Sequence, residues 1–290
     1  MLKWRALSFS LLSLLLWAIF FAGGWIGSSL YVFCACVMIS LAALECSKML
    51  NDSGTAGFPA LSGLLALLIT AVGLGAPLDV ESSPWLLFPM AVAVLLCAVL
   101  IVGGPWLIIL LKRGEAAKKV FVTYGVGILM PLQFLLTAWV YYDQSTKHKV
   151  MTGPLLLFFI ICATKATDTG GFIFGSLSNK LMKNGNHKLC PTVSPKKSWE
   201  GVFGGIFLAL VTGWIFFTCC GDHKLWWYLA FSTVLAAASI LGDLTESALK
   251  RSCGVKDSGN WIPGMGGALD ILDSFLYTGI ACIPFTRFFD

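Results

Sequence analysis

The sequence predicts an all-α, polytopic integral membrane protein with about nine transmembrane helices and a cytoplasmic N-terminus. Of the 290 residues, 57% are hydrophobic and only 12% are charged, about half of the roughly 25% charged share of a soluble domain. The mean hydropathy is +0.83. Apolar runs of about 20 residues, the length of a membrane-crossing helix, recur along the chain. This composition excludes a soluble globular protein and a disordered chain.

Each predicted helix corresponds to one apolar run. The first follows Lys3 but leads directly into a second run, so we interpret it as a retained helix and not as a signal peptide. The fourth is long and contains Pro105, where we expect a kink. The sixth is short and ends near Asp168. The approximate ranges are 6–22, 26–44, 59–76, 84–111, 120–142, 152–166, 200–220, 225–242 and 271–289.

The basic residues predict the orientation in the membrane. With the N-terminus inside, fifteen of the 20 Lys and Arg residues lie on the cytoplasmic side, four lie outside, and Lys165 lies within a span. This is the bias of the positive-inside rule. The two longest polar loops, 167–199 and 243–270, then both face the cytoplasm, where nucleotides are found. We therefore expect an N-terminal bundle of about five helices with little chemistry, residues 1–150, and a C-terminal catalytic region, residues 151–290.

Several features indicate no site of their own. The ten cysteines form no CxxC pair, and the three histidines lack metal-ligand spacing. The net charge of +5 is modest, and without a basic tail we expect no nucleic-acid partner. In the N-terminal half, Glu45 and Lys48 at the end of the second span are an exception as candidate chemistry; the alternative that we favour is that they are solvated charges at the membrane interface.

The end of the eighth helix carries a polar stripe. If the helix continues to residue 251, then Asp243, Glu246, Ser247 and Lys250 share one face, at i, i+3, i+4 and i+7. An acid at membrane depth is costly and usually functional. The alternative is a solvated helix end.

A glycine-rich segment precedes the last helix. The glycines of residues 263–267 allow close approach of the backbone to a ligand. Asp270 and Asp273 follow at i, i+3, and Mg²⁺ prefers carboxylates together with substrate phosphates. We predict that these two aspartates and Asp243 bind Mg²⁺. The alternative is that they only complement the helix dipole.

A third polar segment, residues 194–201, contains Lys196 and Lys197 in a Pro-containing turn, which suits phosphate binding. Upstream, Lys165 and Asp168 either neutralise each other or complete a polar cavity. The chain has no Walker A loop and no nucleophile-elbow motif. Together the segments predict metal-assisted phosphoryl or nucleotidyl transfer at a membrane surface.

The chain resembles the phosphatidate cytidylyltransferases, also called CDP-diacylglycerol synthases, in a long C-terminal signature. Residues 168–170, 194–197 and 199–201 resemble the other motifs of that family, in the expected order. Three positions depart from the family pattern: Met265 replaces a histidine, Ile271 replaces an arginine, and Ser176 replaces a basic residue. The signature is Ser247-x-x-Lys250-Arg251, Lys256-Asp257 and Pro263-Gly264-x-Gly266-Gly267-x-x-Asp270-x-x-Asp273.

The resemblance implies that CTP and phosphatidic acid give CDP-diacylglycerol and pyrophosphate. It also implies Mg²⁺, with K⁺ as an optional second cation, and a homodimer surrounded by membrane lipids. The implied metal ligands are Asp243, Asp270 and Asp273, which with Lys250 form the catalytic set. The implied substrate-binding residues are Ser194, Lys196, Lys197, Ser247, Arg251, Lys256, Asp257, Gly266, Gly267 and Asp168.

We expect the protein in the bacterial inner membrane, with its active site facing the cytoplasm. A related alternative is a CTP-dependent lipid-alcohol kinase, or a cytidylyltransferase for another lipid phosphate. A transporter is a further alternative, because broken spans and intramembrane charges are typical of transporters. A last alternative is an inactive structural relative of the enzymes, because Met265 and Ile271 depart from the family pattern.

Overall fold

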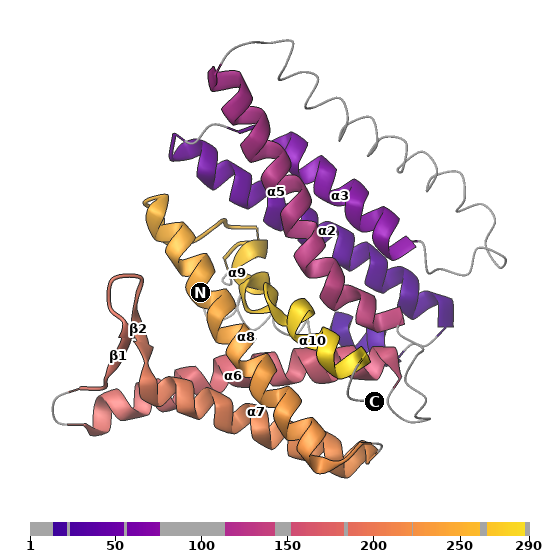
Figure 1. The fold of residues 1–290 in the computed structure, drawn as a ribbon, viewed down its shortest axis with the longest axis vertical. Helices are drawn as coiled ribbons and strands as arrows, with labels where there is room; N and C mark the ends of the chain where they lie inside the picture. Colours follow the sequence, from indigo (N-terminus) through magenta and orange to yellow (C-terminus); the bar gives the residue numbers. More distant parts are fainter. Residues whose placement is uncertain are drawn as a thin grey trace. The chain divides into compact units, whose positions relative to one another are not determined.

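The computed structural model describes residues 14–21, 24–54, 57–75, 114–142, 152–182, 185–221, 223–261 and 266–287. These residues are mostly helical and form two compact units (Figure 1). The first unit comprises residues 1–135 and 252–272, and the second comprises residues 136–251 and 273–290.

Among the described residues, six helical segments are long and apolar enough to cross a membrane, and the 17-residue α3 is a shorter apolar helix. Most of the predicted 6–22 span and all of the 84–111 span lie outside the described residues, so nine helices remains a prediction. Large apolar side chains such as Phe121, Phe172 and Phe203 are exposed, as expected of helices that face lipid. The six segments are Ile26–Asp52, Lys119–Ala138, Gly153–Leu181, Trp199–Cys220, Leu225–Ser252 and Ala268–Phe285.

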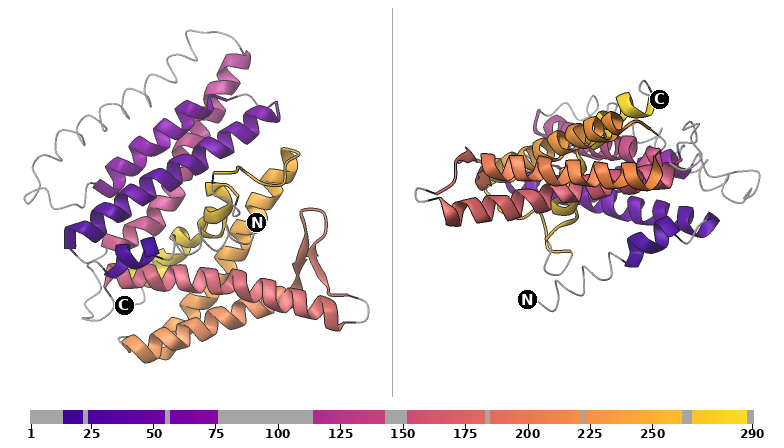
Figure 2. Two further views of the ribbon diagram at one scale, coloured as in Figure 1. Left: turned by 180° about the vertical axis from the view of Figure 1, so that it is seen from behind. Right: turned by 90° about the horizontal axis from the view of Figure 1, so that it is seen from below.

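The first unit contains α2 (Gly24–Asp52), α3 (Pro59–Gly75), α5 (Gly114–Ala138) and α9 (Ala268–Leu272). The first three helices run side by side in Figures 1 and 2. Their buried polar groups bond across the bundle: the Ser62 hydroxyl donates to Ser47 Oγ at 3.0 Å and to the Thr123 carbonyl at 3.1 Å. Helix α9 packs against α2, and Gly267, just before α9, lies against Glu45 of α2.

The second unit contains η2 (Trp139–Tyr142), α6 (Gly153–Leu181), strands β1 (Lys188–Cys190) and β2 (Ser194–Ser198), α7 (Trp199–Cys220), α8 (Leu225–Ser252), η3 (Asp273–Phe275) and α10 (Thr278–Arg287). The strands form an antiparallel hairpin in which Lys188 pairs with Ser198. The expected all-α architecture therefore has one small β-hairpin. It projects from one end of the α6–α7 pair in both figures.

Glycines allow α6 and α7 to lie very close together. A Cβ atom on Gly170 would collide with the Gly204 carbonyl, and one on Gly201 would lie 2.8 Å from the Gly171 carbonyl oxygen. Small residues of this kind let the backbones of membrane helices approach. The packing fixes the start of α7, which follows the hairpin, against the middle of α6, which carries Asp168.

Three helix boundaries differ from the prediction. The sixth helix does not end near residue 166 but continues to Leu181. Its glycines do not break the helix but lie at the contact with α7. Helix α8 continues to Ser252, so the start of the expected 243–270 loop is helical. The last apolar segment begins at Ala268 and is interrupted by η3, so it is not one regular helix.

Candidate functional site

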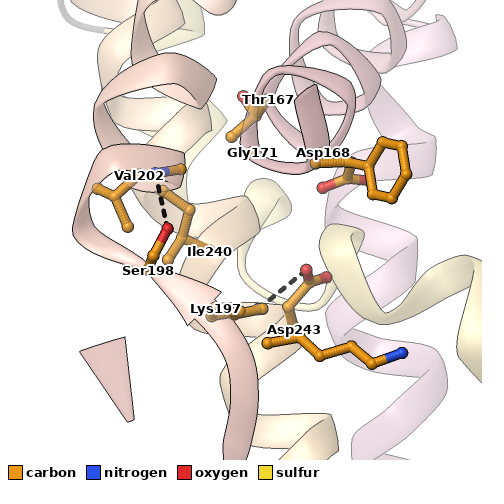
Figure 3. A pocket seen from close by; sticks show the side chains of 11 residues that line it. Thr167, Asp168, Gly171, Lys197, Ser198, Val202, Ile240 and Asp243 are labelled. Carbon is orange, nitrogen blue, oxygen red and sulfur yellow. Dashed lines mark hydrogen bonds and ion pairs between the residues drawn. The ribbon is translucent and has the colours of Figure 1, made fainter. Parts of the chain in front are cut away.

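A cavity of about 200 Å³ opens in the second unit, between α6, β2, α7 and α8. It contains two lysines and two aspartates that the sequence had singled out (Figure 3). Its size suits a phosphate group better than a whole nucleotide. It is lined by Thr167, Asp168, Gly171, Phe172, Lys196, Lys197, Ser198, Gly201, Val202, Ile240 and Asp243.

The central contact is an ion pair between Lys197 Nζ and Asp243 Oδ2 at 3.0 Å, drawn as a dashed line in Figure 3. The two side chains are 25% and 24% exposed. The local structure explains where Lys197 lies. It is followed by Ser198, whose hydroxyl accepts a hydrogen bond from Gly201 N at 3.1 Å and so caps α7. An N-cap of this kind fixes the direction of the chain entering the helix.

Asp168 receives donors at both carboxylate oxygens. Ser239 donates to Oδ1 at 3.0 Å, while Lys165 Nζ lies 3.0 Å and Ser274 Oγ 2.9 Å from Oδ2. Ser274 Oγ also lies 2.9 Å from Asp273 Oδ1, so one hydroxyl connects the two aspartates. Both sequence interpretations of Lys165 and Asp168 are thus partly right, because the pair is mutually neutralising and Asp168 also lines the cavity.

The polar stripe on α8 is confirmed as helical, but one pair within it is internal. Lys250 Nζ lies 2.6 Å from Glu246 Oε2, and these side chains are only 13% and 2% exposed. Ser247 is half-buried beside them. Arg251 Nε donates to the Val193 carbonyl at 3.4 Å, next to Ser194 at the start of β2. The end of α8 therefore supports the hairpin that carries Lys196 and Lys197.

In the first unit, backbone N–H groups hold the Asp270 carboxylate. Gly267 N donates to Oδ2 at 2.8 Å, and Ser258 N lies 3.2 and 3.3 Å from the two oxygens. Gly266 has φ +101°, and a Cβ there would lie 2.6 Å from Asp270 Oδ2. Only glycine adopts this backbone conformation without strain and leaves room for the Asp270 carboxylate. This explains the glycine at position 266 of the motif.

A second cavity, of about 570 Å³, lies next to this segment in the first unit. It is lined by the end of α2, including Lys48 and Asp52, and by residues 255–261, including Asp257. Lys256, by contrast, is exposed and is not among the lining residues.

The predicted carboxylates divide between the units: Asp243 and Asp273 belong to the second, and Asp270 to the first. Within the described part of the chain, no group of three or more Asp, Glu, His or Cys side chains is arranged to hold a metal ion. The metal assignment therefore stays a prediction. Met265 lies outside the described residues, and Ile271 is half-buried in α9.

Sequence reasoning missed several residues that hold these carboxylates. Ser239 and Ser274 orient Asp168, and Ser258 orients Asp270. The interpretation of Glu45 as a solvated interface charge is wrong, because this residue is 2% exposed. For Ser239 a signal existed: it lies four residues before Asp243 on one helix, hence on the same face.

The comparisons with known proteins agree with the geometry. The model of the cytidylyltransferase family matches residues 3–289. A phosphatidate cytidylyltransferase of Staphylococcus epidermidis is 32% identical over 231 residues, 74% of this chain and 85% of that protein. One from Haemophilus influenzae is 42% identical over 147 residues, 49% of this chain and 48% of that protein. One from Staphylococcus aureus is 35% identical over 189 residues, 60% of this chain and 69% of that protein. On this evidence, the chain belongs to the cytidylyltransferase family.

Proposed function

We propose that this chain is a phosphatidate cytidylyltransferase, which converts CTP and phosphatidic acid to CDP-diacylglycerol and pyrophosphate. Family membership and the named relatives support the reaction class. The observation that carries the proposal within the structure is the small cavity in which Lys196, Lys197, Asp168 and Asp243 converge. Cations for phosphates and carboxylates for a divalent ion are the groups that nucleotidyl transfer requires.

The chemistry places few demands on acid–base catalysis. An oxygen of the lipid phosphate forms a bond to the α-phosphorus of CTP, while the bond from that phosphorus to the bridging oxygen of pyrophosphate breaks. The lipid phosphate is already largely ionised, because the second pKa of a phosphomonoester is about 6. Catalysis then consists mainly of positioning and charge neutralisation. Lys196 and Lys197 would bind phosphate oxygens, with Lys197 exchanging its contact with Asp243 for a phosphate, and Asp243 would then be available as a ligand for a divalent cation.

The residues fit Mg²⁺ as cofactor. Mg²⁺ is usually bound through one or two carboxylates, with substrate phosphates and water completing its coordination, so a preformed cluster of three acids is not required. Asp243 and Asp270 are the leading ligands and Asp273 the next. The ion would supply charge neutralisation on the pyrophosphate leaving group. A second cation, K⁺, is proposed on the family resemblance alone.

The finer details of the setting also belong to this proposal. We place the protein in the bacterial inner membrane as a homodimer of nine-helix chains, with the N-terminus and the site facing the cytoplasm. The orientation rests on the distribution of Lys and Arg residues. The relatives come from bacteria, and the apolar helices suit a multi-pass membrane protein.

The proposal is tested by incubating the purified protein with CTP and phosphatidic acid in lipid, with and without Mg²⁺. We expect CDP-diacylglycerol and pyrophosphate in equal amounts, only with Mg²⁺. Asp270→Asn should lower the rate by on the order of 10²–10³-fold, since metal neutralisation contributes several kcal/mol. Asp52→Asn, at an exposed position on α2, is the control.

Two results would overturn the proposal. If folded wild-type protein forms no lipid-linked CMP, the phosphatidate reaction is wrong, and the positions of Met265 and Ile271 become the first to examine. If CDP is released and an offered lipid alcohol is phosphorylated, the protein is a CTP-dependent kinase.

A further inference from the structure

Glu45 is a buried acid in a segment long and apolar enough to cross a membrane. It lies on α2, and its side chain is 2% exposed. Burying a carboxylate costs free energy unless donors compensate it. An acid retained at such a position is therefore a candidate for a functional role.

The donors to Glu45 come from one segment far away in the chain. Ala268 N donates to Oε1 at 3.0 Å, Leu269 N donates to Oε2 at 2.9 Å, and the Ser258 hydroxyl donates to Oε2 at 3.1 Å. All three donors are uncharged. The carboxylate therefore ties both ends of the 258–269 segment to α2.

Two glycines of that segment lie directly against the Glu45 carboxylate. A Cβ atom on Gly259 or on Gly267 would collide with a Glu45 oxygen. The backbone thus passes directly over the Glu45 side chain. Gly267 is the third glycine of the signature motif, and its contact with Glu45 explains why a residue with a side chain would not fit there.

The groups that bind Glu45 are continuous with those that bind Asp270. Ser258 donates its hydroxyl to Glu45 and its backbone N–H to Asp270. Gly267 N donates to Asp270, and the next backbone N–H, that of Ala268, donates to Glu45. A shift of the segment away from Glu45 would therefore move the two N–H groups that orient Asp270.

We propose that Glu45 is a positioning residue that holds the 258–269 segment so that Asp270 is oriented to bind the divalent cation. The inference rests on the proposed function for the role of Asp270 in the reaction, although the cation site itself is testable without CTP or lipid. Groups that orient metal ligands typically change metal affinity by 10–100-fold when mutated.

The test measures Mn²⁺ binding by electron paramagnetic resonance in the full-length protein, together with the Mg²⁺ dependence of the reaction. Glu45→Gln preserves the shape of the side chain but replaces one acceptor oxygen with an NH₂ group that cannot accept. We expect Mn²⁺ to bind about 10–100-fold more weakly, and the Mg²⁺ concentration for half-maximal rate to rise by a similar factor, with most of kcat recovered at saturating Mg²⁺. Lys48→Gln, one turn along α2 and exposed, should change neither quantity.

Each alternative outcome is informative. A folded Glu45→Gln protein with wild-type Mn²⁺ affinity overturns the proposal, even if its Tm falls, because the role would then be structural only. Wild-type protein without Asp270-dependent Mn²⁺ binding also overturns it. If wild type makes no CDP-diacylglycerol but Glu45→Gln still weakens Asp270-dependent Mn²⁺ binding, the proposed function fails and the positioning role stands.

A milder variant covers the case in which Glu45→Gln does not fold. Ser258→Ala removes only the hydroxyl donor to Glu45 and keeps the backbone N–H to Asp270. We expect it to weaken Mn²⁺ binding about 3- to 10-fold, less than Glu45→Gln, because the two backbone N–H groups of Ala268 and Leu269 still donate to Glu45. Unchanged Mn²⁺ affinity in this variant contradicts the proposal.

Discussion

The two compact units hold their carboxylates with different donors. In the first, Glu45 and Asp270 accept hydrogen bonds from backbone N–H groups and a serine hydroxyl. In the second, Asp243, Asp168 and Glu246 each pair with a lysine. The first unit thus orients its carboxylates by hydrogen bonds from the backbone and from Ser258, and the second contains ion pairs whose partners can exchange for ligands.

The lysine–carboxylate pairs of the second unit differ in burial. We expect a buried pair to stabilise the fold and a pair at a cavity to exchange its partner for a ligand. The Glu246–Lys250 pair is almost fully buried, while the Lys197–Asp243 pair lines a cavity. A ligand reaches only the second of these pairs without unfolding the helix end. The comparison therefore predicts that Lys250 contributes to stability and Lys197 to substrate binding.

The largest expected effect is on stability, in Lys250→Met. Removing one partner of a buried ion pair typically costs about 3–5 kcal/mol, and this pair is 13% and 2% exposed. We expect Tm to fall by about 5–15 °C, with the rate of the folded protein at low temperature within about threefold of wild type. Thermal unfolding in detergent and activity measured well below Tm check both.

Two further variants complete this test. Glu246→Gln combined with Lys250→Met should recover most of the lost Tm, since neither charge remains. Lys256→Met, at an exposed lysine of the same signature, should leave Tm unchanged. A stable Lys250→Met protein that has lost activity would instead support the catalytic role predicted from the sequence.

The next effect is on substrate binding, in Lys197→Gln. Hydrogen bonds to charged groups contribute about 1.5–3 kcal/mol, so kcat/KM for CTP should fall by roughly 10- to 10²-fold. Steady-state kinetics with CTP as the varied substrate measure this. Lys196→Gln is the matched control: it lines the same cavity, but its side chain is exposed, and we expect a smaller loss. Equal losses in both variants would show that the ion pair with Asp243 gives Lys197 no special role.

Apolar runs predicted the long helices well, because the membrane requires a length and a composition that can be recognised locally. The continuation of α8 through Asp243 was left open by the sequence, although the helical spacing of its polar residues favoured it. The extension of α6 to Leu181 was missed because Gly170, Gly171 and Gly175 are poor helix formers, and only their packing on α7 explains them. The burial of Glu45 was missed because its donors lie more than 200 residues away.

The smallest expected effect concerns Ser239, the uncharged donor to Asp168 in the second unit. Ser239→Ala removes one of the hydrogen bonds that Asp168 accepts; a typical hydrogen bond contributes about 1 kcal/mol net, and one to a charged group more. We expect kcat/KM to fall about 3- to 10-fold, because Lys165 and Ser274 still hold the other oxygen of Asp168. Ser232→Ala is a close control: Ser232 lies two turns earlier on α8, is equally buried, and its hydroxyl bonds to no described residue. If both variants behave alike, the Ser239 hydroxyl adds nothing to the orientation of Asp168, which Lys165 and Ser274 then hold alone.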